Sequence, residues 1–237
     1  MNKNILITGG SKGIGKNLAI NFKNNNYNVI IIYNNSKNDA LELEKIGINI
    51  YKVDITNYED TIKVINSIIS KFKRIDILIN NAGILKNNLF HKMSYDDWSS
   101  VINTNLTSIY NVTNPILNNM YENKSGKIIN ISSISGLIGS KGQSNYCSSK
   151  FGIIGFTKCL ALEYGRHNIH TNCICPGLVD TDMINNIDDK VKNKILDKIP
   201  VNKIIDPIEI FKICELFINS NNSNGSIVNI DGGMLSG

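Results

Sequence analysis

The chain has 237 residues, 42% of them hydrophobic, which is enough for one sizeable core, and we expect a single domain over residues 1–237. Its net charge of +5 is modest and spread along the chain, which argues against a dedicated nucleic-acid surface. No run approaches the roughly twenty apolar residues of a membrane span, and a strand pattern begins close behind Met1, so we expect no membrane anchor, no signal peptide and a cytoplasmic location.

The five cysteines do not show the paired spacing of a zinc site. Cys173 and Cys175 fall in a predicted buried strand, so we expect reduced, structural thiols and no bound metal. Asparagine is abundant and forms short runs, as at 24–26 and 221–222, that could suggest a prion-like tract. Each run lies between periodic segments where a turn is expected, so we interpret them as turns shaped by compositional bias.

The first segments of the chain form a strand–turn–helix pattern. Asn4 to Thr8 is a short apolar strand, the turn from Thr8 to Gly15 is rich in glycine, and apolar residues at helical spacing follow it. A second strand is predicted at Val29 to Tyr33. Glycines permit a tight turn and let backbone N–H groups at a helix N-terminus approach a pyrophosphate. The pattern favours a dinucleotide site over a purely structural turn.

The end of the second strand bears on the choice of dinucleotide. An acidic residue there would bond the adenosine ribose hydroxyls and reject a 2′-phosphate. This chain has Tyr33, Asn34, Asn35 and Ser36 instead, and Lys12 lies in the glycine-rich turn where it could meet a phosphate. NADPH is therefore favoured over NADH, although Lys12 could also be an ordinary solvated cation.

Strand and helix patterns continue to alternate along the chain. Helix patterns cover Tyr58 to Phe72, Tyr95 to Tyr121, a segment from Gln143 or Ser144, and Pro207 to Ile218. Further strand patterns cover Ile48 to Val53, Ile75 to Asn80, Lys127 to Ile131, Ile169 to Cys175, and Ser226 to Ile230. The alternation predicts a doubly wound (Rossmann) seven-stranded parallel sheet with helices on both faces, whose ligands lie at the carboxyl ends of the strands.

Tyr146 and Lys150 stand four residues apart, on one face of the predicted helix. A free tyrosine has a pKa of about 10, and an adjacent cation lowers it toward the working range. Tyr146 could then give a proton to a carbonyl oxygen held by a serine hydroxyl at the end of the preceding strand. The same spacing occurs by chance in many helices, and the glycine-rich turn is what favours the catalytic interpretation.

With these motifs in place, the whole chain resembles the short-chain dehydrogenase/reductase family. The resemblance covers nearly the full length, and its motifs occur in the family's order. The residues that carry it are the Thr8 to Gly15 turn, Asp54, Asn80 to Gly83, Asn105 within Asn103 to Leu106, Ser133, Tyr146, Lys150, and Pro176 and Gly177 with Thr181.

The resemblance implies four catalytic residues. Tyr146 is the expected general acid, and Ser133 is expected to orient the carbonyl oxygen. Lys150 is expected to lower the pKa of the tyrosine and to bind the nicotinamide ribose, and Asn105 to hold a water in the proton relay behind it. The hydride comes from the cofactor, so the protein supplies position and a proton.

The glycine-rich turn and the resemblance together predict the cofactor site. Asp54 and Ile55 are expected beside the adenine, and Val179 and Thr181 beside the nicotinamide amide. The full predicted set is Gly9, Ser11, Lys12, Gly13, Ile14, Gly15, Asn34, Asp54, Ile55, Asn81, Ala82, Gly83, Tyr146, Lys150, Pro176, Gly177, Val179 and Thr181. The residues expected to serve only as turn, cap, surface or packing groups are Ser132, Ser135, Ser144, His91, His167 and His170.

Within the family the chain most resembles the 3-oxoacyl-[acyl-carrier-protein] reductases of fatty acid biosynthesis, through Gly142 to Tyr146, Pro176 to Met183 and Asn229 to Met234. The segments Phe90 to Met93 and Thr104 to Ser108 lean toward acetoacetyl-CoA reductases. Both groups of enzymes act on a 3-ketothioester with a phosphopantetheine arm. The expected partner is therefore an acyl carrier protein or an acyl-CoA, and a reductase for a steroid, sugar or polyol stays an alternative.

Two further expectations concern partners. An acyl carrier protein is acidic, and Lys124, Lys127 and Arg166 are expected to form a basic rim near the mouth of the site. The resemblance also implies a homotetramer packed through the helices that carry Asn105 and Tyr146. A non-catalytic regulator on the same fold would have a broken Ser/Tyr/Lys set, whereas all three residues are present. The loop from about 182 to 200 is expected to form a substrate lid.

Overall fold

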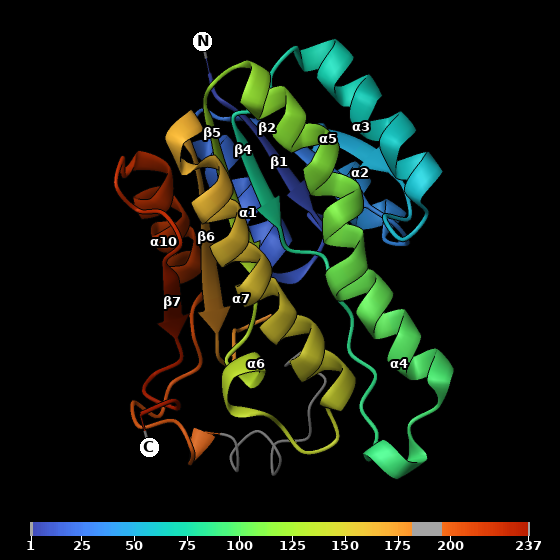
Figure 1. Ribbon diagram of the computed structural model, residues 1–237, viewed down its shortest axis with the longest axis vertical. Helices are drawn as coiled ribbons and strands as arrows, with labels where there is room; N and C mark the ends of the chain where they lie inside the picture. The colour runs from blue at the N-terminus through green and yellow to red at the C-terminus, as the bar shows by residue number, and fades with distance from the viewer. Residues whose placement is uncertain (1, 182–195, 237) are drawn as a thin grey trace.

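Seven parallel strands form one sheet in the order β3-β2-β1-β4-β5-β6-β7 (Figure 1). The computed structural model describes residues 2–181 and 196–236. The strands are β1 Asn4–Thr8, β2 Asn28–Tyr33, β3 Asn49–Lys52, β4 Ile77–Asn80, β5 Gly126–Ile131, β6 Ile169–Pro176 and β7 Ile227–Ile230. The predicted doubly wound, seven-stranded parallel sheet is confirmed, and every strand end lies within two residues of its predicted position.

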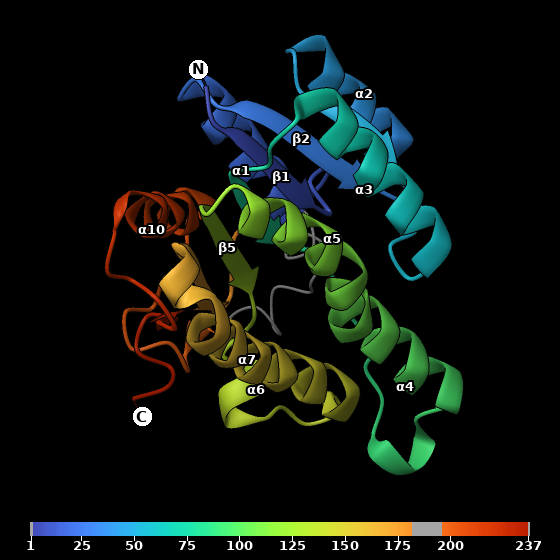
Figure 2. The ribbon, with the colours of Figure 1, turned by 45° about the horizontal axis from the view of Figure 1, so that its top comes forward.

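Helices cover both faces of the sheet (Figure 2). One face packs against α1 (Gly13–Asn24), α2 (Lys37–Lys45) and α10 (Pro207–Asn219). The other packs against α3 (Tyr58–Phe72), α5 (Ser108–Glu122) and α7 (Ser144–Tyr164). Because successive strand residues point to opposite faces, Ile5 and Ile7 belong to the first core and Leu6 to the second. The remaining short elements are η1 Phe90–Lys92, α4 Tyr95–Ile102, α6 Ser135–Ile138 and η3 Gly165–His167.

The predicted long helix from Tyr95 to Tyr121 is helical throughout, but a π-helical turn interrupts its α-helical geometry. It consists of α4, a π-helical turn η2 (Asn103–Thr107) and α5. A π turn inserts extra backbone into an α-helix, and here the buried Asn105 lies inside it. Its side chain accepts a hydrogen bond from Ile84 N at 2.8 Å and donates one to Ile84 O at 3.0 Å. The irregular turn thus joins this helix to the chain that leaves β4.

Asparagine amides tie the sheet together away from the turns. At the amino ends of the strands, Asn28 donates to Asn4 Oδ1 at 2.7 Å and Asn49 donates to Asn28 Oδ1 at 3.2 Å. In the buried centre, Asn80 Nδ2 donates to Asn130 Oδ1 at 2.8 Å, and Asn130 Nδ2 donates to a threonine hydroxyl of α7 at 2.9 Å. These side chains satisfy one another's hydrogen-bonding groups where water is excluded.

The described helices include none that is long and apolar enough to cross a lipid bilayer. Over residues 2–181 and 196–236, no three His, Cys, Asp or Glu side chains gather in a group that could hold a metal ion. The part of the predicted substrate lid from 182 to 195 lies outside the described residues.

Candidate active site

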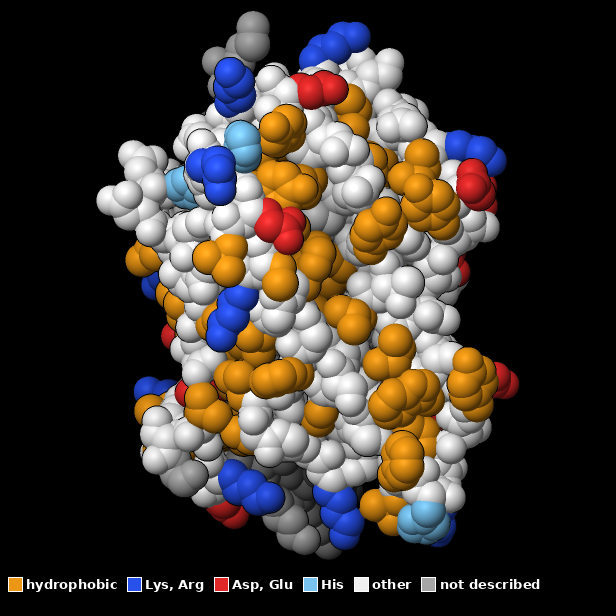
Figure 3. All heavy atoms as spheres, in the orientation of Figure 1, with side chains coloured by type: hydrophobic (Ala, Val, Ile, Leu, Met, Phe, Trp, Pro, Cys, Tyr) orange, Lys and Arg blue, Asp and Glu red, His pale blue; other side chains and the backbone are white. Residues whose placement is uncertain are grey.

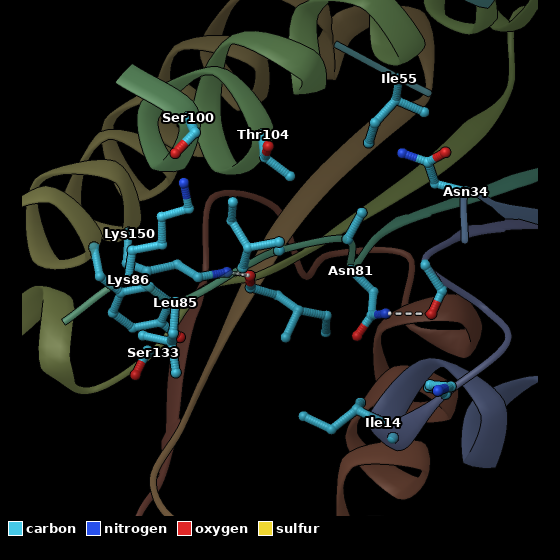
Figure 4. Close-up of a pocket in the computed structure, with 18 of the residues that line it drawn as sticks. Ile14, Asn34, Ile55, Asn81, Leu85, Lys86, Ser100, Thr104, Ser133 and Lys150 are labelled. Atoms are coloured by element: carbon cyan, nitrogen blue, oxygen red, sulfur yellow. Dashed lines mark hydrogen bonds between the residues drawn. The ribbon is translucent and has the colours of Figure 1, made fainter. Parts of the chain in front are cut away.

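A cavity of about 1330 Å³ opens at the carboxyl ends of the parallel strands. It spans the point between β1 and β4 where the strand order reverses, which is where open α/β sheets bind their ligands. Figure 4 shows Ile14, Asn34, Ile55 and Asn81 around one end of it. Ser133, Lys150, Leu85 and Lys86 lie toward the other end in the same view.

Most of the predicted site residues line this cavity. Of the predicted cofactor contacts, Gly15 alone does not line it, and of the four predicted catalytic residues, Asn105 alone does not. Ser133, Tyr146 and Lys150 come from three separate positions of the sequence and meet in its wall.

The glycine-rich turn brings backbone close to the cavity. Gly9 and Gly13 have φ angles of +62° and +52°, which side-chain-bearing residues rarely adopt. A Cβ at Gly13 would meet only Thr181, at 3.6 Å. The lack of a side chain at Gly13 therefore leaves the cavity open above the turn. A Cβ at Gly15 would lie 2.3 Å from Gly9 O and 2.6 Å from Asn81 Nδ2. Gly15 therefore allows α1 to pack closely against the glycine-rich turn and Asn81, and it does not line the cavity.

The end of the cavity beside β2 carries hydroxyl, amide and ammonium groups. The Ser11 and Ser36 hydroxyls lie 2.6 Å apart. Lys12 makes a 3.5 Å ion pair with Asp39, and its side chain is 64% exposed. Such an exposed pair is weak, so the ammonium stays available to an anionic group. These donors and the bare glycine backbone fit the phosphates of a dinucleotide.

Asp54 lies in the same part of the cavity. Its Oδ1 accepts hydrogen bonds from the Thr56 backbone N–H at 3.0 Å and from the Thr56 hydroxyl at 2.7 Å. Partial burial raises the pKa of Asp54, but the hydrogen bonds from Thr56 and Asn34 together outweigh it and lower the pKa. The carboxylate therefore stays ionised and fixed at the end of the strand.

Lys150 is the buried cation of the site. It is 4% exposed, and its Nζ donates a hydrogen bond to Ile131 O at 2.9 Å. The Nζ lies 5.6 Å from the centre of the Tyr146 ring, one turn away on α7. In the part of the chain that the structure describes, no carboxylate pairs with it. Burial lowers the pKa of Lys150 from its ordinary 10.5 to about 8, opposed by two nearby thiols.

The pKa of Tyr146 differs from the predicted direction. Burial raises it, and a hydrogen bond with Ser133 only partly opposes that rise. The expected fall in the pKa through Lys150 is therefore not found, because burial of the phenol, together with the nearby Cys147, raises the pKa. A raised pKa keeps the proton on Tyr146 at neutral pH, which suits a group that donates a proton.

Two of the serines expected to be turn or cap residues support these groups. The Ser132 hydroxyl donates to Lys150 O at 2.7 Å and ties the end of β5 to α7. Ser133 Oγ accepts a hydrogen bond from Ser135 N at 3.1 Å, which fixes the hydroxyl in the wall of the cavity. Ser132 is thus a cross-link between two elements, and only Ser135 acts within the turn.

Asn105 lies behind the cavity wall. A Cβ placed on Gly83 would be 3.4 Å from Asn105 Oδ1 and 3.6 Å from Lys150 Nζ, so the glycine alone separates them. Besides its two bonds to Ile84, Asn105 donates to Ser149 Oγ at 3.2 Å. Both amide hydrogens are therefore used, and the side chain holds the segment after β4 against α7.

Sequence reasoning missed Asn145, which precedes the candidate acid. Its side chain is fully buried, and Nδ2 donates to Lys86 O at 3.0 Å and to Asp97 O at 3.1 Å. Its Oδ1 accepts a hydrogen bond from Tyr146 N at 2.8 Å. Asn145 thus joins α4 and the segment after β4 to the first turn of α7. Nothing in its local pattern distinguishes it from the many other asparagines of this chain.

The missed lining residues come mainly from α4 and the segment after β4. The helical residues Asp96, Ser99, Ser100 and Asn103 recur at spacings of three and four, which is the signal of one polar helix face. In or directly beside these two segments the missed residues are Ile84, Leu85, Lys86, Asp96, Ser99, Ser100, Asn103 and Thr104, and those missed elsewhere include Ile32, Val53, Thr56, Ile131, Gln143 and Leu178.

The predicted basic rim is wrong within this chain. Lys127 is the second residue of β5, at the amino end of the sheet, opposite the cavity. Its Nζ lies 2.9 Å from His170 Nδ1 and also bonds Ser220 O. Lys124 and Arg166 lie in the turns before β5 and β6, also at the amino ends. Proximity to the motif in the sequence was misleading, because the strand carries these residues to the other side of the molecule.

We predict that Lys150→Met abolishes activity but stabilises the fold at pH 7. A lysine whose pKa falls from 10.5 to about 8 on folding costs about 3 kcal/mol while it is charged. Since the unfolded chain binds the extra proton between these values, wild-type stability should rise from pH 8 to 10.5 and approach that of the variant. Urea denaturation across this range measures the difference. Lys158→Met, an exposed change on α7, is the control, and a Lys150→Met variant less stable than wild type at pH 7 would contradict the prediction.

Known proteins resemble the chain over its whole length. The family model described as short chain dehydrogenase matches residues 3–192. A 3-oxoacyl-[acyl-carrier-protein] reductase of Chlamydia trachomatis is 40% identical, with 99% of this chain and 98% of the relative covered. An acetoacetyl-CoA reductase of Shinella zoogloeoides is 41% identical, with 99% of each covered. Among solved structures, that of ElxO with NADP bound has a TM-score of 0.93 at 34% identity and covers all of both chains.

These similarities agree with the parallel sheet, the glycine-rich turn and the Ser133, Tyr146 and Lys150 cluster. The family match and the full-length relatives do not distinguish a carrier-protein substrate from a CoA substrate, since both kinds of relative are about equally similar. They do identify the kind of enzyme. The chain belongs to the short-chain dehydrogenase/reductase family of oxidoreductases.

Proposed function

We propose that this protein is an NADPH-dependent reductase that converts a 3-oxoacyl thioester to the 3-hydroxyacyl thioester in fatty acid elongation. The observation that carries the proposal is the meeting of Ser133, Tyr146 and Lys150 in one wall of a cavity that also contains the glycine-rich turn. Relatives at 40% and 41% identity are named for the reduction of 3-oxoacyl and acetoacetyl thioesters, which supports this substrate class.

In the proposed mechanism, NADPH held at the glycine-rich turn would supply a hydride for the carbonyl carbon of the substrate. Tyr146 donates its phenolic proton to the carbonyl oxygen as negative charge develops there, and the Ser133 hydroxyl donates a hydrogen bond to the same oxygen. The Lys150 ammonium stabilises the phenolate that remains, because opposite charges attract strongly where water is excluded. Ser132, Asn105 and Asn145 keep these groups in place through their hydrogen bonds.

We predict that Tyr146→Phe lowers kcat by roughly 10² to 10⁴, the usual contribution of general acid catalysis. The variant keeps the ring and should still bind NADPH, which fluorescence titration of the nucleotide can show. Tyr58→Phe, at an exposed tyrosine on α3, is the matched control and should leave kcat unchanged. A kcat near the wild-type value in Tyr146→Phe would remove this residue from the mechanism.

The choice of NADPH rests on the donors beside β2 and on the lack of a carboxylate at positions 33–36. The solved structure of ElxO, which binds NADP, supports the same choice.

We predict a higher kcat/KM with NADPH than with NADH. In Lys12→Gln we predict a smaller ratio of the NADPH value to the NADH value. Lys16→Gln is the control, since Lys16 pairs with Glu42 and does not line the cavity. Steady-state kinetics with both nucleotides test this, and a higher kcat/KM with NADH in the wild type would overturn it.

We propose an acyl carrier protein as the bearer of the substrate. The net charge of +5 favours encounter with an acidic partner.

We predict that kcat/KM is higher for the acetoacetyl carrier protein than for acetoacetyl-CoA. This difference should fall as salt is added, because screening weakens long-range attraction. Equal values without a salt effect would reject carrier-protein docking and favour the CoA thioester.

We also propose that the chain forms a homotetramer packed through α5 and α7. Tyr110 and Tyr121 on α5 are 54% and 47% exposed, and Phe151 and Leu162 on α7 are 59% and 83% exposed. Figure 3 shows hydrophobic side chains gathered over this side of the molecule. Exposed apolar side chains in such number favour an interface.

We predict a tetrameric mass in static light scattering and a smaller mass for Leu162→Glu. A monomeric wild type would reject the proposal.

A further inference from the structure

Cys173 and Cys175 form a buried thiol pair outside the proposed mechanism. Alternate residues of a strand point to the same face, and on β6 this places the two sulfur atoms 4.0 Å apart. Both residues are fully buried and belong to a cluster that also contains Ile134, Ile153 and Ile154. All five cysteines of the chain are free thiols.

The pair lies directly behind the catalytic end of the cavity. Cys175 precedes Pro176, which lines the cavity, and Ser132, another lining residue, donates its hydroxyl hydrogen to Lys150 O. Both thiols are close enough to the Lys150 ammonium to change its pKa. The two sulfur atoms therefore lie behind the cavity wall, close to Lys150.

The two thiols influence each other's ionisation. The contact with Cys173 lowers the pKa of Cys175 against the effect of burial, which raises it. The thiolate is the form of cysteine that attacks an electrophile. Because the two sulfur atoms lie 4.0 Å apart, one small atom can bond to both of them.

The 4.0 Å separation of the two sulfur atoms limits which bonds and ligands the thiol pair can form. A disulfide would require the sulfur atoms to approach from 4.0 Å to about 2.05 Å within one strand. Zinc favours four ligands, and no third His, Cys, Asp or Glu joins the pair among the described residues. A trivalent arsenic atom that carries one organic group needs only two sulfur ligands, and its product is uncharged, which suits apolar surroundings.

We propose that Cys173 and Cys175 are a binding site for trivalent organoarsenicals, and that occupancy inactivates the enzyme by displacing Ser132 and Lys150. With an arsenoxide, each sulfur forms one bond to arsenic and the arsenic–oxygen bonds break. The oxygen leaves as water with the two thiol protons, and no atom changes oxidation state. Because the product wedges a new atom between two packed residues, the neighbouring strand end and α7 must shift.

Phenylarsine oxide and intact-mass spectrometry test the site on the whole protein. We expect one adduct per chain, located by peptide mapping within Ile169–Pro176, and loss of activity that a competing dithiol restores. Saturating NADP⁺ should slow adduct formation, because the path to the thiols passes the cavity wall. Cys173→Ala and Cys175→Ala should each lose the dithiol-bridged adduct, whereas Cys159→Ser, at an exposed cysteine, should retain it.

An adduct that survives in both alanine variants, or that maps to another segment, would overturn the proposal, and so would the absence of any adduct on wild type. Circular dichroism checks that the variants fold, and mapping on the wild type decides the matter if they do not. The adduct is counted without any substrate. Failure of the proposed thioester activity therefore leaves this measurement intact, and failure of the measurement leaves the proposed activity intact.

Discussion

The buried charge of Lys150 is the constraint around which the active end of this molecule is built. Its ammonium is removed from water and donates a hydrogen bond to one backbone carbonyl, that of Ile131. It has no carboxylate partner in the described ranges. An arrangement of this kind destabilises the fold and persists only where the surrounding structure imposes it. The parallel sheet imposes it here, because β5 supplies the carbonyl and the adjacent Ser132 fixes the helix that carries the lysine.

The two ends of the cavity are built in different ways. Beside β1 and β2, glycine backbone and small polar groups form the wall, so the path of the backbone sets the shape of this end of the cavity. At the catalytic end, side chains form it, and each is held by another residue: Tyr146 by Asn145, and Ser133 by the Ser135 amide. Such support restricts the reacting groups to one geometry before the substrate arrives, which is how positioning lowers a barrier.

Local patterns were sufficient for the sheet, and together with the family resemblance they predicted the glycine-rich turn and the Ser133, Tyr146 and Lys150 cluster that line the cavity. The glycine-rich turn and the spacing of Tyr146 and Lys150 are short-range features, and a parallel sheet brings strand ends together wherever they lie in the sequence. Properties set by the folded environment were not predictable. The rise in the pKa of Tyr146 comes from burial, the interruption at Asn105 from its bonds to Ile84, and the position of Lys127 from the direction of its strand.

The asparagine side chains that link the strands have a consequence for how the protein responds to acid and base. An amide neither gains nor loses a proton between mild acid and mild alkali, so the links from Asn4 to Asn28 and from Asn80 to Asn130 keep the same strength throughout that range. These links between the strands are therefore unaffected by the pH changes that alter the charges of Lys150 and Cys175. Below about pH 8, where Lys150 stays charged in the folded chain, a change in turnover with pH should therefore report the protonation of the reacting groups and not a loosening of these links between strands.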